Sequence, residues 1–304
     1  MRSRDSRVSS AEPRPPFQGG DVTSATLVVS CPDRQGIVAT LAQLLHSQGA
    51  NITQSDQYTD SADGMFFQRI CFDLLDAQKG LEAVRDAIST TAVGFEMTWT
   101  LDPGERVAKV ALMVSRFDHC LYDLLLRHRS GELACEIPVI LSNHEDLGPI
   151  ARQFDIPFHV FPITQENKAE QEARQQVLLD EIGIDLIVLA RYMQVLSGEF
   201  IGHYGGQIIN SHHSFLPAFV GAKPYQQAYD RGVKLIGATA HYATEDLDEG
   251  PIIAQGVAVV SHRDSAKELA RRGRDVERMV LGDAVRLHLE HRVCVHGNKT
   301  VVFS

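Results

Sequence analysis

The chain has 304 residues, of which 44% are hydrophobic and 22% are charged, and its formal net charge is −10. This length allows two domains with proper hydrophobic cores. The negative charge argues against a general binder of nucleic acid or anionic membranes. The longest apolar runs are far shorter than the roughly 20 residues that a membrane-spanning helix needs.

The N-terminal 22 residues are rich in Arg, Ser, Pro and Gly and show no apolar period. This composition predicts a disordered leader over residues 1–22. The stretch lacks the apolar core of a secretory signal, and Asp5 and Glu12 count against a transit peptide.

The cysteines are few, scattered and without Cys-x-x-Cys spacing. This pattern predicts free thiols, a cytoplasmic location and no zinc site. The five are Cys31, Cys71, Cys120, Cys135 and Cys294.

Residues 23–101 predict a small domain with the element order βαββαβ. The third strand alternates between apolar and polar residues, which predicts one face on a core and the other in solvent. Strands are expected at 25–30, 51–59, 65–75 and 93–101, and helices at 37–48 and 78–90.

The loop before the first helix reads Cys31-Pro32-Asp33-Arg34-Gln35-Gly36. Asp33 is a candidate cap for that helix. The glycine would let a carboxylate approach bare backbone N–H groups, although a tight loop alone also explains it. The segment resembles the ACT regulatory domain. This resemblance implies that Asp33, Arg34 and Gly36 bind a small amino-acid effector, and that paired domains make the protein a homo-oligomer.

Residues 102–106, Asp-Pro-Gly-Glu-Arg, predict a linker, and from 107 to 304 strands alternate with helices. That rhythm predicts a doubly wound α/β sheet with helices on both faces. A capping box begins at Ser265. Strands are expected at 107–114, 138–141, 158–161, 185–190, 235–241 and 251–260, helices at 121–128, 147–154, 167–182, 224–231 and 265–291, and a closing hairpin at 293–303.

Two stretches in this second region carry candidate catalytic groups. Asn210 and His212 follow the apolar pair Ile208-Ile209, and residues i and i+2 of a strand point to one face. Open α/β sheets bind ligands at such strand ends. An amide N–H and an imidazole aimed at one point can stabilise an oxyanion. The second stretch, from His241 to Pro251, places acids on a turn between two apolar strands.

Asn-x-His followed by Ser-Phe-Leu-Pro, together with Asp-x-Gly-Pro beginning at Asp248, resembles the folate-dependent formyltransferases. The resemblance implies a Rossmann-like catalytic domain in which Asn210, His212 and Asp248 are catalytic. It also implies a pteridine pocket lined by the loop after the strand at 185–190, although this loop contains apolar side chains that would equally suit packing on the next helix. The residues expected to bind substrate are Met193, Gln194, Val195, Leu196, His241 and Thr244.

The chemistry of a formyl group on nitrogen is that of a formamide, and it assigns a role to each candidate. Asn210 and a protonated His212 would stabilise the oxyanion. Asp248 would orient the nucleophile, take its proton and relay a proton to the departing nitrogen. Which of His212 and Asp248 is the base stays open. His212 and His213 cannot chelate from one face of a strand, so we expect no metal site.

The loop after the strand at 107–114 indicates which molecule accepts the formyl group. Glycinamide ribonucleotide formyltransferases have a glycine-rich loop there that holds the substrate phosphate through backbone N–H groups. Here the loop begins Ser115-Arg116-Phe117-Asp118 and contains no glycine. This argues against a phosphorylated acceptor and favours water.

The whole layout, over about residues 24–304, is similar to the formyltetrahydrofolate deformylase family. The similarity includes Ser115-x-x-x-His119-Cys120-Leu121 and the C-terminal segment from His296 to Phe303. It implies hydrolysis of 10-formyltetrahydrofolate to formate and tetrahydrofolate, in support of purine biosynthesis, with folate as substrate and no prosthetic group. Two alternatives stay open: formyl transfer to an unphosphorylated amine, and an amino-acid-sensing protein whose catalytic half is inactive.

Overall fold

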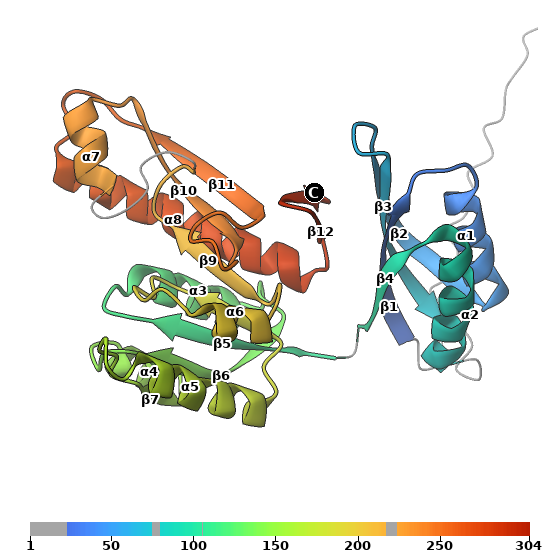
Figure 1. Ribbon diagram of the computed structural model, residues 1–304, viewed down its shortest axis with the longest axis horizontal. Coiled ribbons are helices and arrows are strands. Elements are labelled where there is room, and N and C mark those ends of the chain that lie inside the picture. Colours follow the sequence, from blue (N-terminus) through green and yellow to red (C-terminus); the bar gives the residue numbers. More distant parts are fainter. Residues whose placement is uncertain (1–22, 75–79, 105, 217–223) are drawn as a thin grey trace, which may run out of the picture.

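The computed structural model describes residues 23–74, 80–104, 106–216 and 224–304 (Figure 1). The predicted leader lies outside these residues, as does Glu105 of the predicted linker. A small sheet with two helices and a larger sheet with helices on both faces lie side by side (Figure 1).

The N-terminal part confirms the predicted order βαββαβ. Its four strands form one antiparallel sheet in the order β2-β3-β1-β4, and both helices pack on the same face of it (Figure 1). The elements are β1 (Thr23–Pro32), α1 (Ile37–Ser47), β2 (Ala50–Asp60), β3 (Met65–Leu74), α2 (Gly80–Phe95) and β4 (Thr98–Pro103).

Two local predictions in this part were wrong. The N-cap of α1 is Gly36, with φ 99°, and no side chain caps the helix, so Asp33 does not cap it. Residues 93–95 end α2 instead of beginning a strand. Val84, Ile88 and Ala92 are buried at a four-residue spacing, which carries the helix past the expected end. β4 then runs to Pro103, so the first two residues of the expected linker are paired with β1.

The strand β3 departs from the predicted one-sided pattern. Phe66 and Ile70 face the helices, but Phe67 and Arg69, on the opposite face, are buried as well. The C-terminal hairpin of β12 (Val293–His296) and β13 (Lys299–Val302), which was predicted, covers the outer face of β3. The face of β3 that was expected to be in solvent is therefore covered by residues more than 200 positions away in the sequence.

The second part confirms the doubly wound sheet. Its strand order is β11-β10-β9-β8-β5-β6-β7. Strands β5 to β9 are parallel to one another, and β10 runs antiparallel to both of its neighbours, β9 and β11. The strands are β5 (Ala108–Val114), β6 (Cys135–Ser142), β7 (Phe158–Val160), β8 (Leu186–Leu189), β9 (Ile208–His212), β10 (Leu235–Tyr242) and β11 (Ile252–Val259). The helices are α3 (His119–Arg129), α4 (Gly148–Gln153), α5 (Lys168–Ile182), α6 (Gly198–His203), α7 (Pro224–Arg231) and α8 (Ala266–Leu289).

The alternation of β5 divides the core of this part into two layers. Val110, Leu112 and Val114 pack with α3, α4 and α8, whereas Ala111 and Met113 pack with α5 and α6. Both faces of the strand are thus buried, as its continuous apolar run predicts. Half of the predicted capping box is present, since the Ser265 hydroxyl accepts from the Glu268 N–H at the start of α8, whereas the Glu268 carboxylate accepts from Arg271. No helix in the described part of the chain is long and apolar enough to cross a bilayer.

Candidate active site

The central polar groups meet where β9 ends at the carboxyl edge of the sheet. β9 and β10 are antiparallel neighbours, and their register places Asn210 opposite His241. The Asn210 Nδ2 lies 3.3 Å from the His241 Nε2. The alternation of β9 points His212 to the same side as Asn210, as predicted.

The third predicted catalytic residue is brought to this pair by the turn after β10. The Asp248 Oδ2 lies 3.0 Å from the His212 Nδ1, and its Oδ1 accepts from the Asn210 Nδ2 at 3.3 Å. Asp248 has a φ of 59°, a left-handed conformation that is strained for a residue other than glycine. Gly250 permits the turn, because a Cβ there would lie 1.8 Å from the Tyr242 carbonyl oxygen.

Hydrogen bonding orients both imidazoles. The His241 Nδ1 lies 2.9 Å from the Tyr242 carbonyl oxygen and donates to it, and its Nε2 lies near both the Asn210 amide and the Asp248 carboxylate. The His212 Nδ1 donates to Asp248, and its buried Nε2 has no hydrogen-bond partner among the described residues. This nitrogen is therefore free to meet a bound substrate.

The Asp248 carboxyl is held in its charged form. Burial alone would raise its pKa, but hydrogen bonds and charge from His212 and His241 outweigh burial and hold the pKa of Asp248 well below its usual range. An ionised carboxylate is the form required to accept a proton from water.

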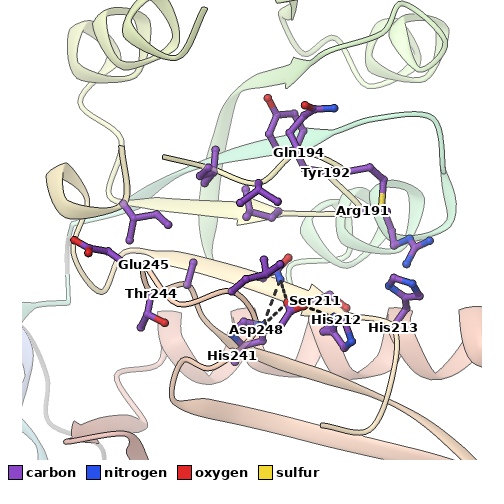
Figure 2. Close-up of a pocket in the computed structure, with 18 residues that line it drawn as sticks. Arg191, Tyr192, Gln194, Ser211, His212, His213, His241, Thr244, Glu245 and Asp248 are labelled. Carbon is purple, nitrogen blue, oxygen red and sulfur yellow. Dashed lines mark hydrogen bonds and ion pairs between the residues drawn. The ribbon is translucent and has the colours of Figure 1, made fainter. Parts of the chain in front are cut away.

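A cavity of about 430 Å³ opens beside these groups (Figure 2). Every residue predicted to be catalytic or to bind substrate lines it. The Met193 and Val195 side chains are about half exposed and form an apolar wall, while Leu196 also packs in the core near Phe200. The predicted lining residues are Met193, Gln194, Val195, Leu196, Asn210, His212, His241, Thr244 and Asp248.

The loop that carries Met193 is held by hydrogen bonds from residues that the sequence analysis did not assign to the site. The buried Ser115 hydroxyl accepts from the Met193 N–H at 2.9 Å and donates to the Asn143 Oδ1 at 2.6 Å. At the other end of the loop, Ser197 caps α6 and its N–H is directed at the buried Glu172 carboxylate. These contacts hold the apolar wall against the cavity.

Comparison with known proteins identifies the family. The formyl transferase family profile matches residues 108–285, and the ACT domain profile matches residues 25–89. A formyltetrahydrofolate deformylase from Synechocystis sp. is 53% identical over 281 residues, which is 92% of this chain and 99% of that protein. One from Bacillus subtilis is 47% identical, covering 95% of this chain and 96% of its own.

The chain belongs to the formyltetrahydrofolate deformylase family. The crystal structure of a deformylase from Pseudomonas syringae matches with a TM-score of 0.89 at 47% identity, over 94% of this chain and 95% of that one. A glycinamide ribonucleotide transformylase from Symbiobacterium toebii matches with a TM-score of 0.62 at 29% identity. That match covers 95% of the transformylase but 65% of this chain.

This deformylase-family chain has a second buried polar group beside the cavity, which the sequence analysis missed. Glu277 of α8 is 1% exposed; its Oε2 lies 2.8 Å from the His119 Nε2, and its Oε1 accepts from the Tyr225 hydroxyl at 2.5 Å. The Arg191 Nε lies 3.6 Å from the Glu277 Oε2. The signal in the sequence that could have revealed Glu277 is its position among the apolar residues on the buried face of an amphipathic helix.

His119, Cys120 and Glu277 also have the atom types of a metal site, with ligand atoms within 4.8 Å of one another. Burial, followed by the charge of Glu277, raises the pKa of the Cys120 thiol, which disfavours the thiolate that a metal needs. Arg191 already supplies a positive charge to Glu277. We therefore interpret this group as a hydrogen-bonded ion cluster.

The three residues predicted to bind an effector lie in the ACT-like part, in the exposed loop before α1. The Arg34 guanidinium donates to the Gly94 carbonyl oxygen at 2.8 Å and lies 4.6 Å from the Phe95 ring centroid. Asp33 is bonded through its backbone N–H to the Gly64 carbonyl oxygen. The left-handed Gly36 leaves the start of α1 without a side-chain cap.

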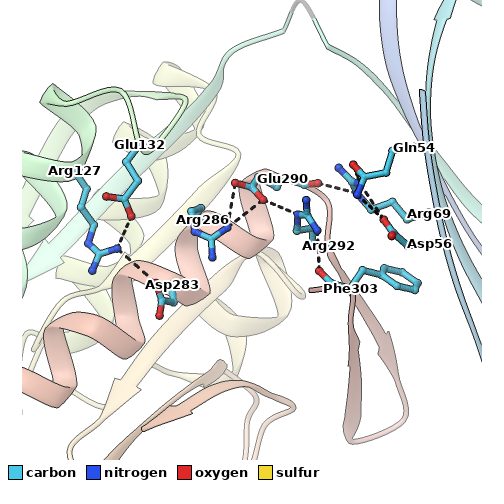
Figure 3. Close-up of polar contacts among 10 residues, drawn as sticks. All are labelled: Gln54, Asp56, Arg69, Arg127, Glu132, Asp283, Arg286, Glu290, Arg292 and Phe303. Atoms are coloured by element: carbon cyan, nitrogen blue, oxygen red, sulfur yellow. Dashed lines mark hydrogen bonds and ion pairs between the residues drawn. The ribbon is translucent and has the colours of Figure 1, made fainter. Parts of the chain in front are cut away.

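The ACT-like and catalytic parts are joined through Arg69 of β3 (Figure 3). Its Nε donates to the carbonyl oxygen of Glu290, the residue that ends α8, at 3.1 Å. Its Nη1 contacts the Gln54 Oε1 at 3.2 Å and the Asp56 Oδ2 at 3.4 Å. This guanidinium therefore connects the end of α8 to strands β2 and β3.

Replacing Arg69 by methionine is expected to lower the free energy of unfolding by about 2–3 kcal/mol. This is less than the loss for a fully buried ion pair, because Asp56 retains some solvent. Urea unfolding would measure it. Arg271→Met, which removes an exposed pair with Glu268, is the matched control and should change stability by less than about 1 kcal/mol. Equal effects of the two substitutions would contradict a joining role for Arg69.

Proposed function

We propose that the protein hydrolyses 10-formyltetrahydrofolate to formate and tetrahydrofolate. The observation that carries the proposal is the hydrogen-bonded set of Asn210, His212 and Asp248 at the edge of a largely apolar cavity. Membership of the deformylase family supports the same reaction. The proposed substrate is the folate itself, and the chemistry of these residues requires no prosthetic group.

In the proposed reaction, Asp248 starts hydrolysis by accepting a proton from water, because it is ionised and lines the cavity. The oxygen of that water forms a bond to the formyl carbon, and the carbonyl oxygen becomes an oxyanion. The unpartnered His212 Nε2, when protonated, donates to this oxyanion. Asn210 is assigned the second donor, since its contacts at 3.3 Å are long enough to exchange for a stronger acceptor.

The second half of the proposed reaction breaks the carbon–nitrogen bond. Asp248 returns the proton to the departing folate nitrogen, so that tetrahydrofolate leaves neutral at that atom. The carbon keeps the water oxygen and leaves as formic acid, which releases its proton to become formate. The apolar wall at Met193 and Val195 is proposed to pack against the pteridine ring.

For the ACT-like part, we propose that Asp33, Arg34 and Gly36 bind a small amino-acid effector. The uncapped start of α1 supports this, because its first N–H groups suit a carboxylate. We further propose that the protein is a homo-oligomer paired through this part, since β2 and β4 are its edge strands. The five cysteines are free, which suits the proposed cytoplasmic location.

The test of the main proposal is an assay of the full chain with 10-formyltetrahydrofolate and no amine acceptor. Formate and tetrahydrofolate should appear in equal amounts, and the rate should be measured with and without glycine or methionine as effector probes. Product formed only after an amine is added would indicate a formyl transferase instead. Amino-acid binding without any turnover would indicate a sensing protein.

A further inference from the structure

Arg191 is a buried cation in the wall of the catalytic cavity that the proposed reaction does not use. The residue is 9% exposed and lines the cavity, and its guanidinium points toward His213 (Figure 2). Its Nε and Nη1 are buried and have no hydrogen-bond partner within the described ranges. Guanidinium N–H groups left in this state are costly unless a ligand satisfies them.

The neighbouring acid does not satisfy these N–H groups. Glu277 lies 3.6 Å from the Arg191 Nε, beyond hydrogen-bond distance. Both carboxylate oxygens of Glu277 already have closer partners, His119 at 2.8 Å and Tyr225 at 2.5 Å. The Phe117 ring lies 4.8 Å from the guanidinium carbon and covers one face of it. The N–H edge of the guanidinium therefore remains available to bind a ligand.

The backbone of Arg191 supports a functional role for this side chain. Its φ is 62°, in the left-handed region that glycine adopts freely. An L-residue there is strained. A glycine would relieve the strain at this position, but it would also remove the guanidinium from the cavity.

His213 lies between this cation and the catalytic residues. Its ring centroid is 5.2 Å from that of His212 and 6.2 Å from that of Tyr225. Burial, followed by the positive charge of Arg191, lowers the pKa of His213 to about 4, so the ring is neutral at pH 7. A neutral imidazole can hydrogen-bond an anion without competing for the charge of Arg191.

We propose that Arg191 and His213 form a carboxylate-binding subsite next to Asn210, His212 and Asp248. A planar guanidinium edge matches the two oxygens of a carboxylate. The site lies beside the residues at which the formyl carbon is hydrolysed, so the favoured ligand is the formate product. This identification of the ligand rests on the proposed function. The other source of the same chemistry is a carboxylate of the glutamate tail of folate.

The test of the subsite is equilibrium binding of ¹³C-formate to the full chain, followed by NMR without any turnover. Arg191→Met should weaken binding at least tenfold. Arg191→Gly, which removes the side chain and relaxes the backbone, should do the same if the methionine variant folds poorly. Arg174→Met is the matched control, since Arg174 also lies over a ring, that of Phe161, but is exposed and does not line the cavity. It should leave binding unchanged.

A second arm compares KM for 10-formyltetrahydrofolate with KM for the analogue that lacks glutamate. If Arg191→Met raises KM at least tenfold only for the substrate with glutamate and leaves formate binding intact, the subsite exists and holds the tail. If neither formate binding nor this KM ratio depends on Arg191, the subsite is overturned. Formate binding that depends on Arg191 without hydrolysis would contradict only the proposed function. Hydrolysis in which neither measurement depends on Arg191 would contradict only the subsite.

Discussion

Asp248→Asn is expected to slow hydrolysis of 10-formyltetrahydrofolate by about 10²–10⁴-fold, the usual range for loss of a positioned general base. An asparagine keeps the size of the side chain and its contact with the Asn210 and His212 region. It cannot accept a proton from water, and it cannot support a positive charge on His212. We therefore expect kcat to fall while the dissociation constant for tetrahydrofolate changes little.

The matched control is Asp246→Asn, in the same turn. Asp246 is exposed, and the Thr244 hydroxyl contacts it only through the backbone carbonyl. This substitution removes one negative charge close to the cavity but none of the hydrogen bonds around Asp248. Single-turnover formate release should distinguish the two variants. A near-normal rate in Asp248→Asn would refute its assignment as the base.

The depressed pKa of Asp248 also predicts the shape of the pH profile. A carboxyl whose pKa lies below its usual value of about 3.9 remains ionised throughout pH 5–9. The base form is thus fully present over this range and is lost only in stronger acid. A plot of kcat/KM against pH should therefore show no acid limb that arises from Asp248 above pH 5. An acid limb there that also disappears in an Asp248→Glu variant would contradict the low pKa.

The sequence predicts that the proposed catalytic pair Asn210 and His212 lie together because the geometry of that pair is local. Asn210 and His212 are two positions apart on one strand, and strand alternation alone places them together. Asp248 is two residues before Gly250, in the turn that follows β10, the antiparallel neighbour of β9. The capping box at Ser265 and the C-terminal hairpin depend on similarly short-range rules.

The residues that were missed depend on long-range packing. Arg69 appeared to lie on a solvent face of β3, and only the C-terminal hairpin and the end of α8 bury it. Arg191 and Glu277 come from different elements and meet across the carboxyl edge of the sheet. Gly273 has no local signal at all, yet a Cβ there would lie 2.1 Å from the hydroxyl of Tyr225, which bonds Glu277. No pattern within one element reveals such contacts.

His212→Gln is expected to lower kcat by about 10²–10³-fold, the usual loss when one oxyanion donor is removed. Glutamine keeps a polar side chain but removes the imidazole whose Nε2 is assigned to the oxyanion. The matched control is His203→Gln. His203 also forms an ion pair with an aspartate, Asp180, at 3.1 Å, but both side chains are about half exposed and neither lines the cavity. Its removal should leave kcat unchanged.

The double variant His212→Gln/Asp248→Asn separates a coupled pair from two independent groups. If His212 is effective because Asp248 holds it protonated and oriented, the second substitution removes little that the first has left. The double variant should then be no more than about tenfold slower than Asp248→Asn alone, whereas independent contributions would multiply to about 10⁴-fold or more. A multiplicative loss would mean that the 3.0 Å contact between the two side chains does not link their roles. The His203–Asp180 pair has a similar distance, 3.1 Å, outside the cavity lining, so coupling in turnover is the property expected to distinguish the His212–Asp248 pair.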